Sequence, residues 1–165
     1  MKKYEFTGET KEIRLLFRTA TLHRIRATVA FGIVEVGDLG GWIEKEENLS
    51  HEGKAWVCGD AKVWGNAKVC GDAEVWGNAK VFSASHVLVI GAIGSRNDFT
   101  TFYRDKDNEI TVKCGCFLGK IDRFLEKVTQ THGDSKYALV YRAAVEVAKL
   151  QIDLSGEAPK DADEE

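Results

Sequence analysis

The chain has 165 residues, of which 44% are hydrophobic and 30% are charged, and its formal net charge is -3. This composition is typical of a folded protein and excludes a disordered or fibrous chain, while the near-neutral charge argues against duplex nucleic acid as a partner. No run approaches the roughly 18 apolar residues of a membrane span and the first residues lack a signal peptide's apolar segment, so we expect a cytoplasmic protein with no membrane partner.

Residues 1–48 are expected to form an N-terminal β-hairpin cap. Apolar and polar residues alternate over residues 13–17 and again over residues 22–29, which is typical of two strands with one apolar face. The glycine-rich stretch 37–43 is interpreted as a turn that leads into the next segment. A cap is needed because the end of a stacked repeat exposes backbone edges and apolar interior.

Residues 49–91 contain a six-residue repeat with the pattern Ala-x-Val-x-Gly-(Asn/Asp). β-Branched valine at the third position suits an inward-pointing strand residue, and Gly followed by Asn or Asp tolerates the left-handed backbone of a tight corner. Three such units close one coil, which predicts a short three-sided β-helix of about two coils, expected to be left-handed. The inward positions are Val57, Val63, Val69, Val75, Val81 and Val87.

Stacking three units apart predicts which side chains lie one above another outside the coil. Trp64 should lie below Phe82, Cys58 below Trp76, and Cys70 below Leu88. Exposed aromatic faces of this size are unusual in a monomer, so we expect them to pack against flanking segments or a second subunit, in a homo-oligomer such as a trimer. The outward positions, interpreted as a solvated face, are Lys62, Lys68, Glu74 and Lys80.

Residues 92–154 are expected to form a ββαα lobe. Strand-like stretches 99–104 and 109–114 flank a turn at residues 105–108, and apolar residues recur at helical spacing over 118–131 and 135–152. Residues 155–165 carry five acidic side chains against one lysine and are predicted to be a disordered tail. The expected fold class is therefore mainly β with C-terminal helices.

The motifs of this chain resemble a known group of proteins. The stretches 24–27 (Arg-Ile-Arg-Ala), 36–44 and 48–50, together with the Ala-x-Val-x-Gly-Asn units, are similar to hexapeptide-repeat proteins of phages, prophages and enteric bacteria, often labelled putative acyltransferase or polymer-forming protein. Residues 92–98 and 114–117 resemble a segment of their phage members. The resemblance covers most of the chain and implies the fold and a phage context better than it implies an activity.

The strongest candidate binding site follows the repeat. Guanidinium groups, hydroxyls and backbone N–H groups at a glycine turn suit phosphate or ribose recognition, and nearby aromatic rings can stack on a base. The competing interpretation is that Arg96 and Asp98 pair and the aromatic residues belong to the core. The candidate residues are Ser95, Arg96, Asn97, Asp98, Thr100, Thr101, Tyr103 and Arg104.

Catalytic and metal sites are less well supported by the sequence. His51 and His86 lie at the two ends of the repeat and are the candidate bases for a CoA-dependent acyltransferase, but two coils are short for such an enzyme. A zinc site would need a third histidine nearby. Four cysteines in a cytosolic chain are expected to be reduced, and Cys114-Gly-Cys116 is a weak metal motif, so no metal or cofactor is predicted.

The amino-acid sequence is compatible with three functions. The first is a non-catalytic, oligomeric, phage-related binding protein that sequesters a small phosphate-bearing or nucleotide-derived ligand, such as an immune signalling nucleotide. The second is the hexapeptide-repeat acyltransferase that uses CoA. The third is a structural or assembly protein whose faces mediate self-association.

Overall fold

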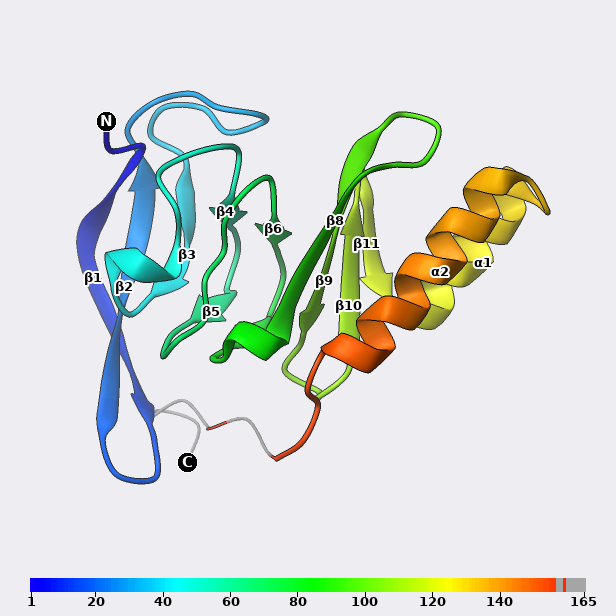
Figure 1. The fold of residues 1–165 in the computed structure, drawn as a ribbon. Coiled ribbons are helices and arrows are strands. Elements are labelled where there is room, and N and C mark those ends of the chain that lie inside the picture. The colour runs from blue at the N-terminus through cyan, green and yellow to red at the C-terminus, as the bar shows by residue number, and fades with distance from the viewer. Residues whose placement is uncertain (157–158, 160–165) are drawn as a thin grey trace.

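The fold was analysed in a computed structural model that describes residues 1–156 and residue 159. The chain is mainly β, with two helices at its C-terminal end, as the sequence predicts. A hairpin and stacked short strands lie on one side, a second sheet lies in the middle, and the helix pair lies on that sheet's other face (Figure 1). No helix within the described part of the chain is both long and apolar enough to cross a membrane.

The N-terminal hairpin is present, with bounds that differ from the prediction. Its strands are β1 (Tyr4–Arg14) and β2 (Thr19–Ala27), so residues 15–18, partly predicted as strand, form the turn. Stretch 37–43, predicted as a turn, instead contains β3 (Leu39–Ile43), which pairs with β2. The glycines there serve close packing, because a Cβ on Gly40 would lie 2.6 Å from Ile25 Cγ1 and one on Gly41 would lie 2.6 Å from the Ala61 oxygen.

The repeat folds into short parallel strands that stack at the predicted interval. Val63 of β5 (Lys62–Val63) pairs with Val81 of β7 (Lys80–Val81), three repeat units later, and β3 precedes them in the same sheet. Val57 of β4 (Trp56–Val57) pairs in the same way with Val75 of β6 (Glu74–Val75). These four valines are fully buried, so the prediction that Val63 and Val81 are neighbours in adjacent rungs is confirmed.

The last predicted unit, residues 85–90, does not continue this stack. A 3-10 turn, η2 (Ala84–His86), follows β7, and Val87 begins β8 (Val87–Ile93), which pairs antiparallel with β9 (Asp98–Arg104). The preceding unit lacks the Gly-Asn corner, and Ser83 instead accepts a hydrogen bond from the Ser85 amide and so starts the 3-10 turn. Leu88 consequently pairs with Phe102, so the predicted stacking of Leu88 over Cys70 is wrong.

One outer face of the repeat is covered by the hairpin. Trp64 and Phe82 stack with ring centroids 4.9 Å apart, as predicted. Ile13 and Leu22 pack with them in one apolar cluster, so this aromatic face is enclosed by a flanking segment. The prediction that Lys62 and Lys80 are solvated is wrong: both are buried, and the Lys80 ammonium donates to the Pro159 oxygen at 3.2 Å.

The C-terminal part contains four strands before its helices, where two were predicted. Strands β10 (Ile110–Cys114) and β11 (Phe117–Lys120) complete the sheet order β11-β10-β9-β8. The helices α1 (Ile121–His132) and α2 (Lys136–Gln151) pack on one face of this sheet through Phe124, Val128 and Val145. Tyr103 on the opposite face joins the core of the repeat.

The predicted acidic tail begins in an ordered segment. The backbone oxygens of Ser155 and Gly156 accept hydrogen bonds from Arg104 at 2.8 and 2.6 Å. Residues 157–158 and 160–165, where the rest of the predicted disorder falls, lie outside the described residues.

Candidate functional site

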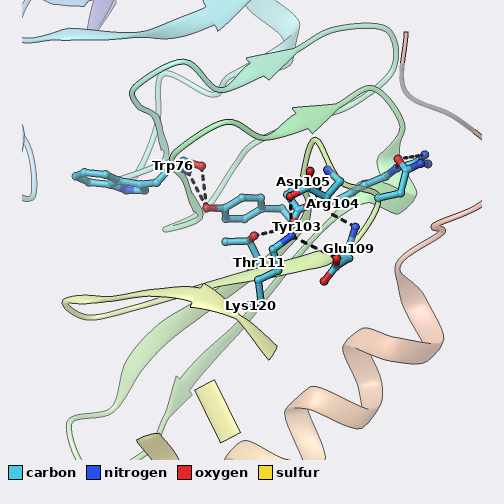
Figure 2. A network of polar contacts seen from close by, with 9 residues as sticks. Trp76, Tyr103, Arg104, Asp105, Glu109, Thr111 and Lys120 are labelled. Carbon is cyan, nitrogen blue, oxygen red and sulfur yellow. Dashed lines mark hydrogen bonds and ion pairs between the residues drawn. The ribbon is translucent and has the colours of Figure 1, made fainter. Parts of the chain in front are cut away.

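Five of the eight candidate residues lie on β9, and two of them, Thr101 and Tyr103, fasten the sheet to the repeat. Thr100, Thr101 and Tyr103 are buried. The Thr101 hydroxyl accepts a hydrogen bond from the Glu74 amide at 3.0 Å. The Tyr103 hydroxyl donates to the Trp76 oxygen at 2.8 Å and accepts from the Trp76 amide at 3.2 Å, as Figure 2 shows. Their polar groups are therefore used inside the fold.

Arg104 is also buried, and it holds the C-terminal segment. Its Nε and Nη2 donate to Asn108 Oδ1 at 3.1 and 2.6 Å. Its remaining donors reach the backbone oxygens of Ser155 and Gly156, and the guanidinium lies 5.2 Å from the Phe82 ring centroid. Since these contacts occupy the planar fork on which phosphate recognition depends, Arg104 is placed to stabilise the fold.

A second polar network lies beside Arg104, at the turn between β9 and β10 (Figure 2). Asp105 accepts hydrogen bonds from the amides of Asp107 and Glu109 at 2.8 and 3.1 Å and from the Thr111 hydroxyl at 2.8 Å. The Lys120 ammonium lies 3.2 Å from Asp105 and 2.8 Å from Asp107, and it lowers the pKa of Asp107. The positive charge of Lys120 thus offsets the negative charges of this turn.

The two candidate catalytic histidines are both engaged in structural contacts. His51 Nδ1 accepts a hydrogen bond from the Lys3 amide at 3.1 Å, and its ring stacks on Tyr4 at 4.1 Å. His86 is buried; its Nδ1 accepts from the Phe82 amide at 3.1 Å, and its Nε2 lies 3.3 Å from Arg104 Nη1. A general base needs a ring nitrogen open to the substrate, which this arrangement does not offer at His86.

His86 makes the stability of the protein depend on pH. Burial, and then the neighbouring Arg104 charge, lowers the pKa of His86 from 6.5 to about 4. Because the folded pKa is the lower one, the neutral ring's contribution is complete above pH 6.5 and is lost as the pH falls through 4. The difference between the unfolded and folded pKa values of His86 corresponds to about 3 kcal/mol of stability at most.

We expect the free energy of unfolding to fall as the pH is lowered from 6.5 to 4, which urea titration at several pH values measures. His86→Gln should reduce the dependence of the unfolding free energy on pH. His132→Gln, the same substitution at a histidine that is not fully buried, should leave that dependence unchanged.

The other four candidate residues lie at the exposed end of the β8–β9 hairpin, where Asp98 is the first residue of β9. Ser95, Arg96, Asn97 and Asp98 are all exposed, and Asn97 has a positive φ of 49°. Three of them line a hollow of about 190 Å³ between this hairpin end, the turn between β10 and β11, and the helix pair. We call it the hairpin–helix hollow. Its lining residues are Ser95, Arg96, Asp98, Cys114, Gly115, Cys116, Phe117, Phe124, Lys127, Val128, Thr131, His132 and Tyr141.

Aromatic rings from β11 and both helices lie at this hollow. Phe124 lies 5.4 Å from Phe117 and 5.7 Å from Tyr141, measured between ring centroids. His132 stacks on Tyr141, with ring centroids 5.7 Å apart and an interplanar angle of 26°. Planar groups are favoured next to such rings because offset and edge contacts between aromatic systems are attractive.

The Tyr141 hydroxyl supplies a neutral hydrogen-bonding group in the hollow. Burial, followed by the adjacent Cys114 thiol, raises the pKa of Tyr141 to about 12, so the phenol keeps its proton at neutral pH. The hydroxyl reaches this place because position 94 is glycine: a Cβ there would overlap the Tyr141 oxygen. Gly94 also has a φ of +78°, which other residues rarely adopt.

Most of the hollow was not identified from the sequence. Phe124 and Val128 were interpreted as apolar core residues of a helix. Tyr141 and Lys127 belong to no sequence motif that indicates a binding site. Cys114 and Cys116 were noted only as a weak metal motif; in residues 1–156 and 159, no group of three or more His, Cys, Asp or Glu side chains is arranged to hold a metal ion. The cysteines instead line the hollow as free thiols.

Comparison with known proteins adds no further constraint. The chain matches no protein-family model and no curated protein. What the hairpin–helix hollow binds is therefore inferred from the residues that line it.

Proposed function

We propose that the protein is a non-catalytic binding protein that acts in the cytoplasm and holds a small anionic ligand with a planar body in the hairpin–helix hollow. One observation carries this proposal. The hollow brings the cationic side chains of Arg96 and Lys127 to the same site as three aromatic rings. Cations that face an anionic group and rings that face a planar body are the usual means of recognising a nucleotide or an aromatic acid.

The size of the hollow limits what it can enclose. Its volume of about 190 Å³ is below the roughly 300–1,000 Å³ of sites for drug-sized ligands. A ligand with one ring system and one anionic group is therefore favoured, and a dinucleotide would extend out of the site. This narrows the class of nucleotide-derived ligands suggested by the sequence to mononucleotides and smaller molecules.

The electrostatics favour one anionic group at the rim of the site. Arg96 and Lys127 outnumber the single carboxylate of Asp98 among the lining residues. Asp98 Oδ1 accepts a hydrogen bond from the Phe99 amide at 2.7 Å, so one oxygen of this carboxylate is already bonded to the backbone of its own hairpin. The Tyr141 hydroxyl, neutral at physiological pH, can donate to the same anionic group.

The proposal is tested by ligand-dependent stability. Purified protein is heated with inorganic phosphate, AMP, ADP-ribose, a cyclic dinucleotide and 4-hydroxybenzoate in separate series. We expect AMP or 4-hydroxybenzoate to stabilise the protein most, reaching about 2.7 kcal/mol at 100 times its Kd. If none of the five compounds changes the unfolding temperature at millimolar concentration, the proposal fails.

Paired variants separate binding in the hollow from a general charge effect. Arg96→Ala should weaken binding of the stabilising compound at least tenfold, because it removes the fork that meets the anion. Arg123→Ala removes the same charge from α1 at an exposed position outside the hollow and should leave the Kd nearly unchanged. An equal rise of the Kd in the two variants would show that the ligand binds outside the hollow.

We further propose that the paired rungs belong to a short, three-sided, left-handed β-helix of the kind found in phage hexapeptide-repeat proteins. Two parallel ladders support this proposal, β5 with β7 and β4 with β6. A third side is supported by the parallel bridge between Leu49 and Val69, where the Ser50 amide donates to the Val69 oxygen at 2.9 Å. A crystal structure would test the hand of the coil directly.

A further inference from the structure

Helix α2 carries two apolar stripes, and only one of them faces the sheet. The buried stripe consists of Ala138, Tyr141, Ala144, Val145, Ala148 and the C-cap residue Ile152. A second stripe is exposed: Leu150 is 89% exposed, Val147 48% and Val140 39%. We call the exposed set, completed by Ala143, the outer stripe of α2; Leu139, also exposed, is the neighbour of Val140 in the sequence.

Four positions of the buried stripe have the same spacing as the outer stripe, shifted by two residues. Residues 138, 141, 145 and 148 become 140, 143, 147 and 150 when each number is raised by two. A shift of two residues rotates the position by about 200° around the helix, so the outer stripe lies opposite the buried one. Its spacing of three, four and three residues is that of the a and d positions of a coiled coil.

We propose that the outer stripe of α2 binds the same stripe of a second copy of this chain, forming a homodimer. The residue types favour two strands: Val140 and Val147 occupy a positions and Leu150 a d position, and β-branched residues at a with leucine at d favour a two-stranded parallel pair. Helices that pair in this way do not need to be nucleated, because α2 is already held on the sheet by Val145 and its neighbours.

The charges beside the stripe favour the parallel orientation. With Val140 and Val147 at a positions, Glu146 occupies a g position and Gln151 the e position that follows. In a parallel pair, Glu146 of one copy meets Gln151 of the other, which is compatible with a hydrogen bond. In an antiparallel pair centred on the stripe, the two Glu146 side chains would face each other, and like charges in contact disfavour association.

The interface is short, so the dimer should be of moderate strength. Two heptads on one helix face bury less than the standard interface between stable partners, and we expect a Kd on the order of micromolar. Sedimentation velocity of the full chain between about 1 and 100 µM should show a shift from the mass of one chain toward twice that mass. A single monomeric species over the whole range would overturn the proposal.

Matched variants identify the surface that is responsible. Leu150→Glu should raise the dimer Kd by at least tenfold, while Leu16→Glu, a similarly exposed leucine at 88% in the turn after β1, should leave it unchanged. Circular dichroism checks that both variants remain folded. If Leu16→Glu abolishes association and Leu150→Glu does not, the interface lies on another face and the proposal is wrong.

Cross-linking tests the orientation. Leu150→Cys in a Cys70→Ser, Cys116→Ser background removes the exposed native thiols. A parallel pair places the two introduced thiols against each other, so a mild oxidant should produce a disulfide dimer in high yield. Val140→Cys, placed at an a position in the same background, should also cross-link to its own copy. Cross-linking only when Val140→Cys and Leu150→Cys proteins are mixed would indicate the antiparallel pair and would overturn the parallel arrangement.

Discussion

Arg104→Met is expected to lower the free energy of unfolding by about 3 kcal/mol. Arg104 is only 1% exposed, and its guanidinium donates to Asn108 and to the backbone oxygens of Ser155 and Gly156. Hydrogen bonds from a charged donor contribute about 1.5–3 kcal/mol each. Methionine fills a similar volume without replacing any donor, and relief from the cost of burying the charge offsets part of the loss.

Urea unfolding of the wild type and the variant gives this difference directly. Arg96→Met is the matched control, since the same substitution at an exposed arginine should change stability by no more than about 0.5 kcal/mol. Arg104→Lys should lie between the wild type and Arg104→Met, because it keeps the charge and loses the fork. Amide exchange over residues 153–156 should rise in Arg104→Met; unchanged stability and exchange would show that Arg104 does not hold this segment.

The parts of the fold predicted from the sequence are those encoded within a few residues. The Gly-(Asn/Asp) corners and the inward valines fix each short strand, and identical units stack without further information, so the pairing of Val63 with Val81 follows from the spacing. The two helices were likewise predicted from local periodicity, with ends that differ by a few residues from α1 and α2.

The features that were missed depend on contacts between distant segments. A continuous apolar stretch such as 87–93 fits both a parallel rung and an antiparallel edge strand, and its pairing with β9 decides between them. Lys80 looks solvated in the repeat pattern, but it is buried and its ammonium donates to the oxygen of Pro159, a residue 79 positions along the chain.

The candidate site was predicted in part for the same reason. Ser95, Arg96 and Asp98 could be found because a glycine turn with polar residues is a local signal. Tyr141 and Lys127 come from the two helices, and only the packing of those helices against the sheet brings them to the turn. Arg104 has a residue type suited to anion binding, but its partners Ser155 and Gly156 lie far along the chain.

Gly53→Ala is expected to destabilise the protein by about 3–4 kcal/mol, whereas Gly71→Ala should cost only about 1–2 kcal/mol. The two glycines have nearly the same backbone, with φ of +66° and +64°, so alanine is strained to a similar degree at both. They differ in what lies above them. A Cβ on Gly53 would lie 2.5 Å from the Gly71 oxygen, while one on Gly71 would meet nothing within 4 Å.

The difference between the two variants isolates the stacking of one rung on the next. Backbone cannot yield as a flexible side chain does, so Gly53→Ala must push the rungs apart, and overpacking of this kind costs about 1–3 kcal/mol beyond the local strain. Both variants are compared by urea unfolding under the same conditions. Equal losses of stability would mean that residue 53 does not lie beneath residue 71, which would contradict the stacked arrangement that places the Lys54 amide 3.1 Å from Asp72 Oδ1.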